Sequence, residues 1–175
     1  MREPDAVIVL GIDPGTAVTG YGVVRKERRN PLTLVECGVI RTKPRDDLAQ
    51  RLAEIHDGVT ELIRRHQPTV LSIEDVFYAR NVRTTVVLGH ARGVILLAAA
   101  QAGMAIHEYP PSEIKKAVAG TGAATKLQVQ FMVTRLLRLK SAPQPNDAAD
   151  GVAAALAYAL APELPKIQPI RFSVR

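Results

Sequence analysis

The sequence predicts an α/β fold in which a five-stranded mixed sheet is flanked by helices. The first observation is the order of its apolar patterns: three strand-like segments come first, helical and strand-like segments then alternate, and helices follow. The second is size, because 175 residues, 47% of them hydrophobic, fit one domain with one core. We therefore expect a single domain over residues 1–161 and a basic, proline-containing tail over 162–175.

The first three strands are predicted from short apolar or alternating segments. Residues 6–12 form a continuous apolar run that stops at Asp13, where a Pro-Gly turn follows. Two further strands over 19–26 and 32–42 are separated by a polar, basic link. We expect an antiparallel meander with Asp13 at the carboxyl end of its first strand.

A helix and a fourth strand come next. Apolar residues recur at three- and four-residue intervals over 46–67, which indicates an amphipathic helix that Pro68 terminates. The strand over 69–75 carries Glu74 at its end. Adjacent strand residues point to opposite faces, so Asp75 is expected to point away from Glu74, as a solvated neighbour.

The helix predicted over 84–101 is apolar on nearly every face between Val86 and Ala100. Such a helix must either lie in the core of a monomer or be shared with another subunit. Gly89 and Gly93, four residues apart, would allow close backbone approach along one stripe.

The last elements are a strand over 104–109, a short helix opened by Pro110-Pro111-Ser112, and a longer helix over 124–139. A loop over 141–145 leads into the final helix, which starts near residue 146.

Four acids lie where a strand ends or a helix begins. Asp147 and Asp150 are three residues apart, so both carboxylates project from one helix face. If the strands that end in Asp13 and Glu74 are neighbours, all four carboxylates converge and offer oxygen ligands for Mg²⁺ or Mn²⁺. Two such ions roughly 4 Å apart can support in-line cleavage of a phosphodiester bond that leaves a 5′-phosphate. Taken singly, each acid is equally well explained as a turn residue, a helix cap or a solvated strand end.

The chain carries 23 Lys and Arg against 17 Asp and Glu, a net charge of +6, which favours a polyanionic partner. The N-terminal segment lacks the features of a secretory signal, and no run of 18 uncharged apolar residues occurs. We therefore expect a cytoplasmic protein without a membrane partner.

Five segments together resemble the RuvC family of Holliday-junction resolvases, in the order in which the family has them: GIDPGTAVTGYGVV, IEDVFYARN, LGHARGV, IKKAVAGTGAATK and NDAAD. The resemblance extends from Leu10 to Tyr158. It implies a ribonuclease H-like fold, a homodimer, and metal-dependent cleavage of four-way DNA junctions in recombination and repair, with RuvA and RuvB as partners. The catalytic and metal-binding acids of the family fall on Asp13, Glu74, Asp147 and Asp150.

The resemblance also implies DNA-binding residues. Phe77 falls where the family has an aromatic side chain that stacks on an unpaired base, and Arg80 lies in the same basic segment. Lys115 and Lys126 match family lysines that grip a phosphate near the active site. The alternatives are a core phenylalanine and solvated surface lysines.

Three other interpretations remain open at this stage. GIDPGT resembles the phosphate loop of actin-like and sugar kinases, but that fold needs two lobes, and ATP hydrolysis would reveal it. A YqgF-type nuclease-like protein shares the expected fold. A catalytically silent DNA-binding module would bind junctions through its basic residues without cutting them.

Overall fold

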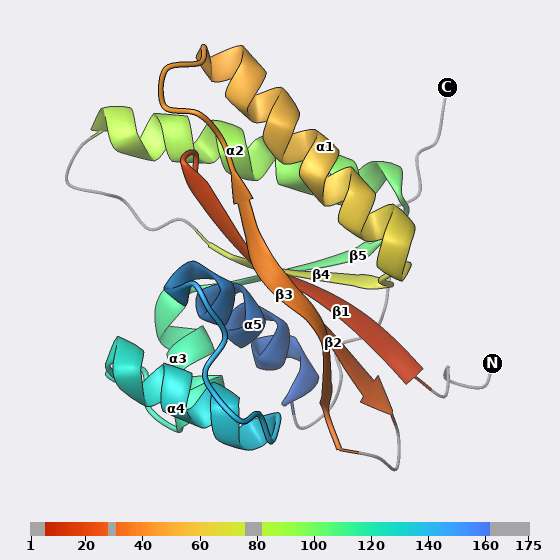
Figure 1. Cartoon of the computed structure of the whole chain (residues 1–175), viewed down its shortest axis with the longest axis vertical. Coiled ribbons are helices and arrows are strands. Elements are labelled where there is room, and N and C mark those ends of the chain that lie inside the picture. The colour runs from red at the N-terminus through yellow and green to blue at the C-terminus, as the bar shows by residue number, and fades with distance from the viewer. Residues whose placement is uncertain (1–5, 28–30, 76–81, 162–175) are drawn as a thin grey trace.

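In the computed structural model of the chain, five strands form one mixed sheet in the order β3-β2-β1-β4-β5 (Figure 1). The structure describes residues 6–27, 31–75 and 82–161. Strand β2 pairs antiparallel with both β1 and β3, whereas β4 pairs parallel with both β1 and β5. The predicted α/β fold with a mixed five-stranded sheet is confirmed.

The elements follow the predicted order. The strands are β1 (Ala6–Asp13), β2 (Val18–Glu27), β3 (Thr33–Arg41), β4 (Val70–Glu74) and β5 (Ala105–Tyr109). The helices are α1 (Leu48–His66), α2 (Val82–Gln101), α3 (Pro111–Ala119), α4 (Lys126–Leu136) and α5 (Asn146–Ala159).

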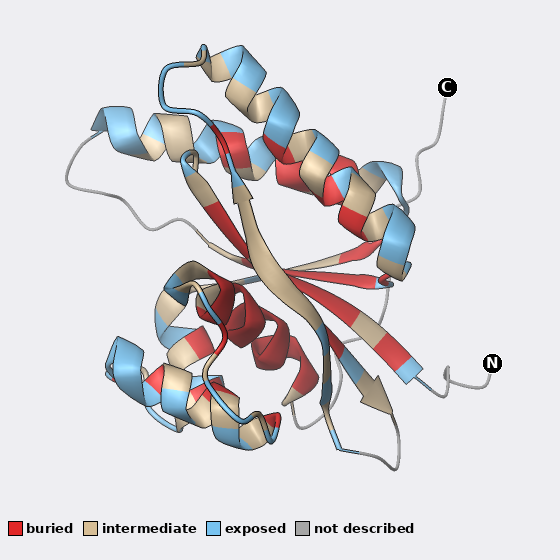
Figure 2. Ribbon diagram, in the orientation of Figure 1, coloured by how far each residue is buried: buried red, intermediate tan, exposed pale blue. Residues whose placement is uncertain are grey.

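The sheet separates two helical layers (Figure 1). Helices α1 and α2 cover one face, and a buried cluster that includes Leu10, Ile55 and Ile95 fills the space between them and the sheet. Helix α5 covers the other face, with α3 and α4 packed outside it. Figure 2 shows α5 as the most completely buried helix, and eleven of its fourteen residues are buried. The central strands β1 and β4 therefore bury side chains on both faces, which explains their continuous apolar runs.

Helix α1 makes the crossover that places β4 parallel to β1. Its first turn is closed by Gln50, whose side chain accepts a hydrogen bond from the Asp47 backbone N–H at 3.3 Å. It ends at Gln67, which adopts a left-handed conformation with φ 48° and donates its backbone N–H to Ile63 at 2.9 Å. Pro68 then prevents the helix from continuing, as the sequence predicts.

Helix α4 is shorter than the predicted span over 124–139. It begins after Thr125, whose side chain caps the helix by accepting the Gln128 N–H at 3.3 Å. It ends because Arg138 adopts a left-handed conformation with φ 53°, while the Leu139 N–H donates to the Thr134 carbonyl at 2.9 Å. This hydrogen bond pattern terminates helices even where no glycine is present.

Helix α2 is buried on only one side. Its inner face contributes Ala91, Ile95, Ala98 and Ala99 to the core. Its outer face carries a stripe of small and apolar residues that no other described part of the chain covers. We call it the outer α2 stripe, and it consists of Val82, Val86, Gly89, Gly93 and Leu97. By length and composition alone α2 is able to span a membrane, but its inner face belongs to the core of this domain. The core therefore covers one face of α2, and the described residues leave the outer α2 stripe uncovered.

Candidate active site

Asp13 and Glu74 lie side by side at the carboxyl ends of two neighbouring inner strands. In the parallel β1–β4 register Ile12 pairs with Ile73, and the acids are the next residue of each strand. The condition set from the sequence, that the two strands be neighbours, is therefore met. Carboxyl ends of parallel strands are where open α/β sheets place their ligands.

The third and fourth acids come from the start of α5, which lies unusually close to the sheet. A Cβ atom at Gly20 would fall on the carbonyl oxygen of Asp147, and one at Gly151 would fall on the backbone of Tyr21. Gly20 is also the residue opposite Asp13 in the β1–β2 register. The missing side chains let the helix backbone approach the strand that pairs with β1, and this approach brings Asp147 to Asp13.

Two more glycines extend the close packing along α5. A Cβ atom at Gly22 would meet Val152, and one at Gly11 would meet the backbone of Gly151 and Ala155. The Ser72 hydroxyl adds a hydrogen bond from β4 to the Ala154 carbonyl at 2.6 Å. The apolar patterns of the sequence do not predict this role for these glycines. The signal for it was the alternation Gly20-Tyr21-Gly22, which leaves one face of a strand without side chains.

The predicted convergence is present for three of the four acids. Carboxylate oxygens of Asp13, Asp147 and Asp150 lie within 4.8 Å of one another. Glu74 is outside this group of three but close enough that its charge raises the pKa of Asp13. Hard carboxylate oxygens from three or four side chains are a donor set that suits Mg²⁺ and Mn²⁺.

Burial and mutual repulsion make the cluster costly when no cation is bound. Burial, followed by the charges of Glu74, Asp150 and Asp147, raises the pKa of Asp13 from 3.8 to about 7. Burial and then the Asp150 charge also raise the pKa of Glu74. Like charges held together in a poorly solvated site favour either a proton or a metal ion. The residues therefore fit a divalent cation.

Two lysines border the acids. Lys126, the first residue of α4, donates to Asp150 Oδ2 from Nζ at 2.6 Å, and this hydrogen bond raises its pKa. Lys115 of α3 is close enough to Glu74 to oppose the rise in the pKa of that carboxyl. Both predicted lysines thus lie at the cluster, each beside one acid.

The loop after Asp13 is held by hydroxyl groups. The Thr19 hydroxyl donates to the Gly15 carbonyl at 2.6 Å, and the Thr42 hydroxyl donates to the Thr16 carbonyl at 2.6 Å. Arg51 of α1 in turn donates from Nε to the Thr42 hydroxyl at 3.0 Å. These bonds attach the loop to β2 and to the end of β3, so the backbone that follows Asp13 is well supported.

Two predicted DNA-binding residues, Phe77 and Arg80, lie outside the described residues. Asp75 points away from the four acids, as strand alternation predicts. The expectation of a solvated neighbour agrees with its side chain being 44% exposed, and its carboxylate also pairs with Arg92 of α2 at 3.3 Å.

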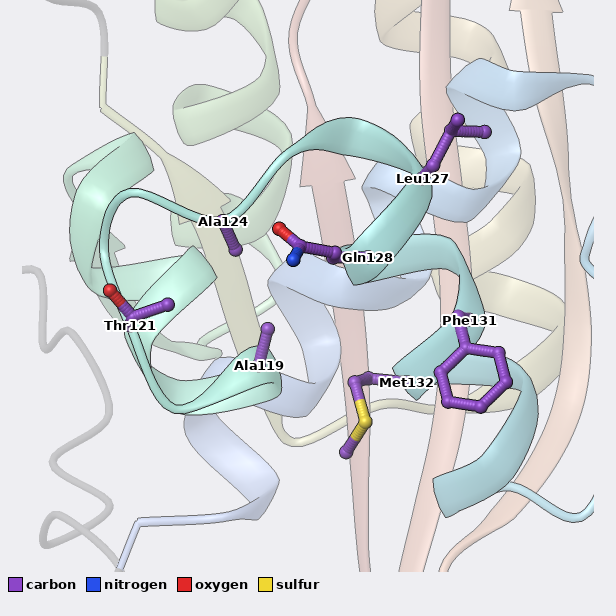
Figure 3. A pocket seen from close by; sticks show the side chains of 7 residues that line it. All are labelled: Ala119, Thr121, Ala124, Leu127, Gln128, Phe131 and Met132. Carbon is purple, nitrogen blue, oxygen red and sulfur yellow. The ribbon is translucent and has the colours of Figure 1, made fainter.

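A shallow apolar groove lies between α3 and α4, apart from the acids (Figure 3). It has a volume of about 370 Å³, and two of its lining side chains, Leu127 and Phe131, are exposed at 77% and 62%. Arg135 lies over the Phe131 ring at 5.9 Å from its centroid. No acid lines this groove, so it is not part of the candidate metal centre.

The fold and the site together define a class: a ribonuclease H-like domain with an acidic cluster at the carboxyl ends of adjacent strands. Comparison with known proteins then gives the family. The profile of the family "Crossover junction endodeoxyribonuclease RuvC" matches residues 9–158. The chain therefore belongs to the RuvC family of crossover junction endodeoxyribonucleases, and it is a hydrolase that acts on DNA.

Individual relatives agree. The RuvC of Pelotomaculum thermopropionicum is 46% identical over 153 residues, which cover 87% of this chain and 93% of that relative. A structure of Thermus thermophilus RuvC matches with a TM-score of 0.84 at 35% identity, over 93% of this chain and 99% of that one. The same protein in complex with a Holliday junction substrate matches with a TM-score of 0.83 at 33% identity, over the same shares.

Proposed function

We propose that this protein resolves four-way (Holliday) DNA junctions by metal-dependent hydrolysis of phosphodiester bonds in homologous recombination and DNA repair. Paired, symmetric nicks would leave 5′-phosphate and 3′-hydroxyl ends. The observation that carries the proposal is the convergence of Asp13, Asp147 and Asp150, with Glu74 beside them, in a chain of the RuvC family.

We assign the four acids as catalytic metal ligands. Their carboxylates would hold two Mg²⁺ ions per active site, with Mn²⁺ as an alternative. When bound, such ions supply an activated water and neutralise the charge of the phosphate under attack. The protein contributes ligand geometry: Asp13 and Glu74 are held by the sheet, and Asp147 and Asp150 by the N-terminal part of a buried helix.

Lys126 and Lys115 would bind the DNA strand that is cut. An ammonium group beside each end of the acidic cluster attracts a phosphate and offsets negative charge as the bond breaks. Lys126 already pairs with Asp150, so a phosphate in the site would share this ammonium with the carboxylate.

A four-way junction is the substrate that the comparisons support. The Thermus thermophilus RuvC structure that contains a Holliday junction has the same fold as this chain. The net charge of +6 favours binding of the backbone. We assign Phe77 to stacking on an unpaired base at the crossover and Arg80 to a backbone contact.

The protein would act as a homodimer. A junction has an approximate two-fold axis, and two copies of one site are needed to cut two strands at related positions. The outer α2 stripe is the surface we assign to the contact, because small residues along it permit close helix approach and Val82, Val86 and Leu97 would leave water. We further propose that it works in the cytoplasm with RuvA and RuvB.

The direct test is cleavage of a labelled synthetic four-way junction by the purified protein. Paired nicks are expected in Mg²⁺ or Mn²⁺ and none in a chelator, whereas a linear duplex of the same sequence should remain intact. Binding should weaken as salt is added, because phosphate contacts release counterions. Binding without cleavage in either metal would instead identify a silent DNA-binding module.

A further inference from the structure

Arg92 of α2 stands between two carboxylates at the edge of the sheet that carries the active site. Its Nη2 atom pairs with Asp75 Oδ1 at 3.3 Å and also with Glu108 Oε2. Asp75 directly follows β4, and Glu108 is the next-to-last residue of β5. One arginine thus connects a helix to the ends of two strands.

The two carboxylates lie on the face of the sheet opposite the acidic cluster. Along β4, Leu71 and Ile73 pack in the core on the α1–α2 side, whereas the Ser72 hydroxyl bonds to α5 on the other side. Glu74 continues the α5 side, where Asp150 raises its pKa, and Asp75 continues the α2 side. Arg92 therefore contacts the end of β4 from the α2 side, whereas the Glu74 side chain lies on the α5 side.

The backbone at this point also depends on the two strands staying together. Glu74 pairs with Tyr109 at the end of the β4–β5 register, and the Asp75 N–H extends the pairing by donating to the Tyr109 carbonyl at 2.8 Å. Without the Arg92 guanidinium, the negative charges of Asp75 and Glu108 on neighbouring strands would repel each other and weaken the pairing of the strand ends. The Arg92 side chain is 18% exposed, whereas those of Asp75 and Glu108 are 44% and 48% exposed, so solvent screens the attraction mainly on the carboxylate side.

We infer that Arg92 is a positioning residue for Glu74: by joining Asp75 and Glu108 under the end of β4, it holds the Glu74 backbone where its carboxylate meets the other acids. The inference rests on the proposed function, since it concerns the metal site of that function. Arginine suits the role because its planar guanidinium can face two carboxylates at once, whereas lysine offers a single point charge.

A simple charge effect gives the opposite result, which makes the inference testable. Removing the Arg92 charge makes the neighbourhood of the acids more negative, and this alone would strengthen the binding of a divalent cation. If Arg92 instead positions Glu74, its loss weakens cation binding, because one ligand moves away. Outer partners of metal ligands typically contribute 10–100-fold to metal affinity or activity.

The experiment measures Mn²⁺ binding to the full chain without DNA, by electron paramagnetic resonance, in Arg92→Gln and Arg92→Lys. We expect affinity to fall roughly 10-fold in Arg92→Gln, with partial recovery in Arg92→Lys. The matched control is Arg64→Gln, which removes an arginine that contacts Glu61 through two hydrogen bonds of 2.8 and 2.9 Å on the exposed face of α1. Its Mn²⁺ affinity should be unchanged.

Unchanged or tighter Mn²⁺ binding in folded Arg92→Gln would overturn the inference. If that variant does not fold, Glu108→Gln replaces it, since it keeps the arginine and removes one of its two partners; a loss of at least about threefold is expected, and no loss overturns the inference. Hydrogen exchange gives a second readout, in which the Asp75 amide should lose protection in Arg92→Gln. Wild-type protein that binds Mn²⁺ but cuts no junction would refute the proposed function while leaving this test intact.

Discussion

Gly20 of β2 lies against Asp147 of α5 so closely that a Cβ atom at position 20 would fall on the Asp147 carbonyl oxygen. Gly20 is at the same time the register partner of Asp13. A single residue without a side chain therefore separates a strand acid from a helix acid. The metal centre depends on this close packing as directly as on the acids themselves.

We predict that Gly20→Ala lowers junction cleavage by roughly 100-fold, because a displacement of about 1 Å is enough to cost that much. The added methyl group should also destabilise the fold by about 1–3 kcal/mol, measured by urea unfolding. Gly38→Ala is the control, since its Cβ would meet only the end of the Tyr21 ring, 2.7 Å away. Gly20→Ala protein that cuts as fast as wild type would show that the close approach is dispensable.

Asp13→Asn should abolish cleavage and yet stabilise the metal-free protein. The pKa of Asp13 is raised to about 7, so the folded state holds a proton that the unfolded state releases above pH 3.8. The metal-free wild type therefore loses stability as the pH rises from about 4 to 7. Above that range, the ionised Asp13 destabilises the folded state by its full amount. Removing the charge should increase the free energy of unfolding by roughly 2–4 kcal/mol at pH 8 and change it little at pH 4.

Thermal melts at the two pH values in a chelator check this prediction, with Asp57→Asn as the control. The side chain of Asp57 is 83% exposed and lies on α1. Junction affinity of Asp13→Asn should stay close to wild type, because the substitution removes a metal ligand and no contact to the DNA backbone. Equal destabilisation by both substitutions at pH 8 would contradict the assignment of a repulsive cluster.

Lys126→Gln should reduce the cleavage rate by roughly 10²–10³-fold, the typical effect of losing one preorganised donor. Because the ammonium donates to Asp150 at 2.6 Å, Lys126→Arg should keep part of the activity. Single-turnover cleavage at saturating protein separates this effect from binding. Lys116→Gln makes the same charge change at an exposed position on α3 and should leave the rate within a few-fold of wild type.

Leu97→Asp should convert the dimer to a monomer. This position is 48% exposed on the outer α2 stripe, where an aspartate is well tolerated in a free subunit but would be buried without a partner in the contact we propose. Light scattering at micromolar concentration measures the change. Val35→Asp on β3, 41% exposed, introduces the same charge elsewhere and should remain dimeric. A wild-type protein that is monomeric would refute the assignment of this surface.

Much of the fold could be read from local patterns. The alternation and continuity of apolar residues predicted all five strands, and the three- and four-residue spacing predicted α1 with its end at Pro68. Periodicity reports which face of an element is buried, and this depends mainly on residues near one another in sequence. The ends of α4 escaped prediction because they depend on Thr125 and Arg138, whose roles lie in backbone geometry rather than in an apolar pattern.

The candidate site divides in the same way. The identities of the four acids followed from their places at strand ends and a helix start, together with the family resemblance. Their meeting was predicted only on the condition that β1 and β4 are neighbours, and it also required α5 to approach β2 through Gly20 and Gly151. The sequence did not connect Arg92 to Asp75 and Glu108, since that contact joins three elements.

The sequence by itself determined the elements of this protein, their order, and the residues able to bind a metal ion. The tertiary structure alone decided that these residues meet at one site, that only one face of α2 is buried, and that Asp75 pairs with an arginine. The physical reason is that side-chain periodicity is a local property, whereas strand pairing and helix packing join residues distant in sequence. Those long-range contacts bring the carboxylates close together, and the resulting repulsion makes the site favour a divalent cation.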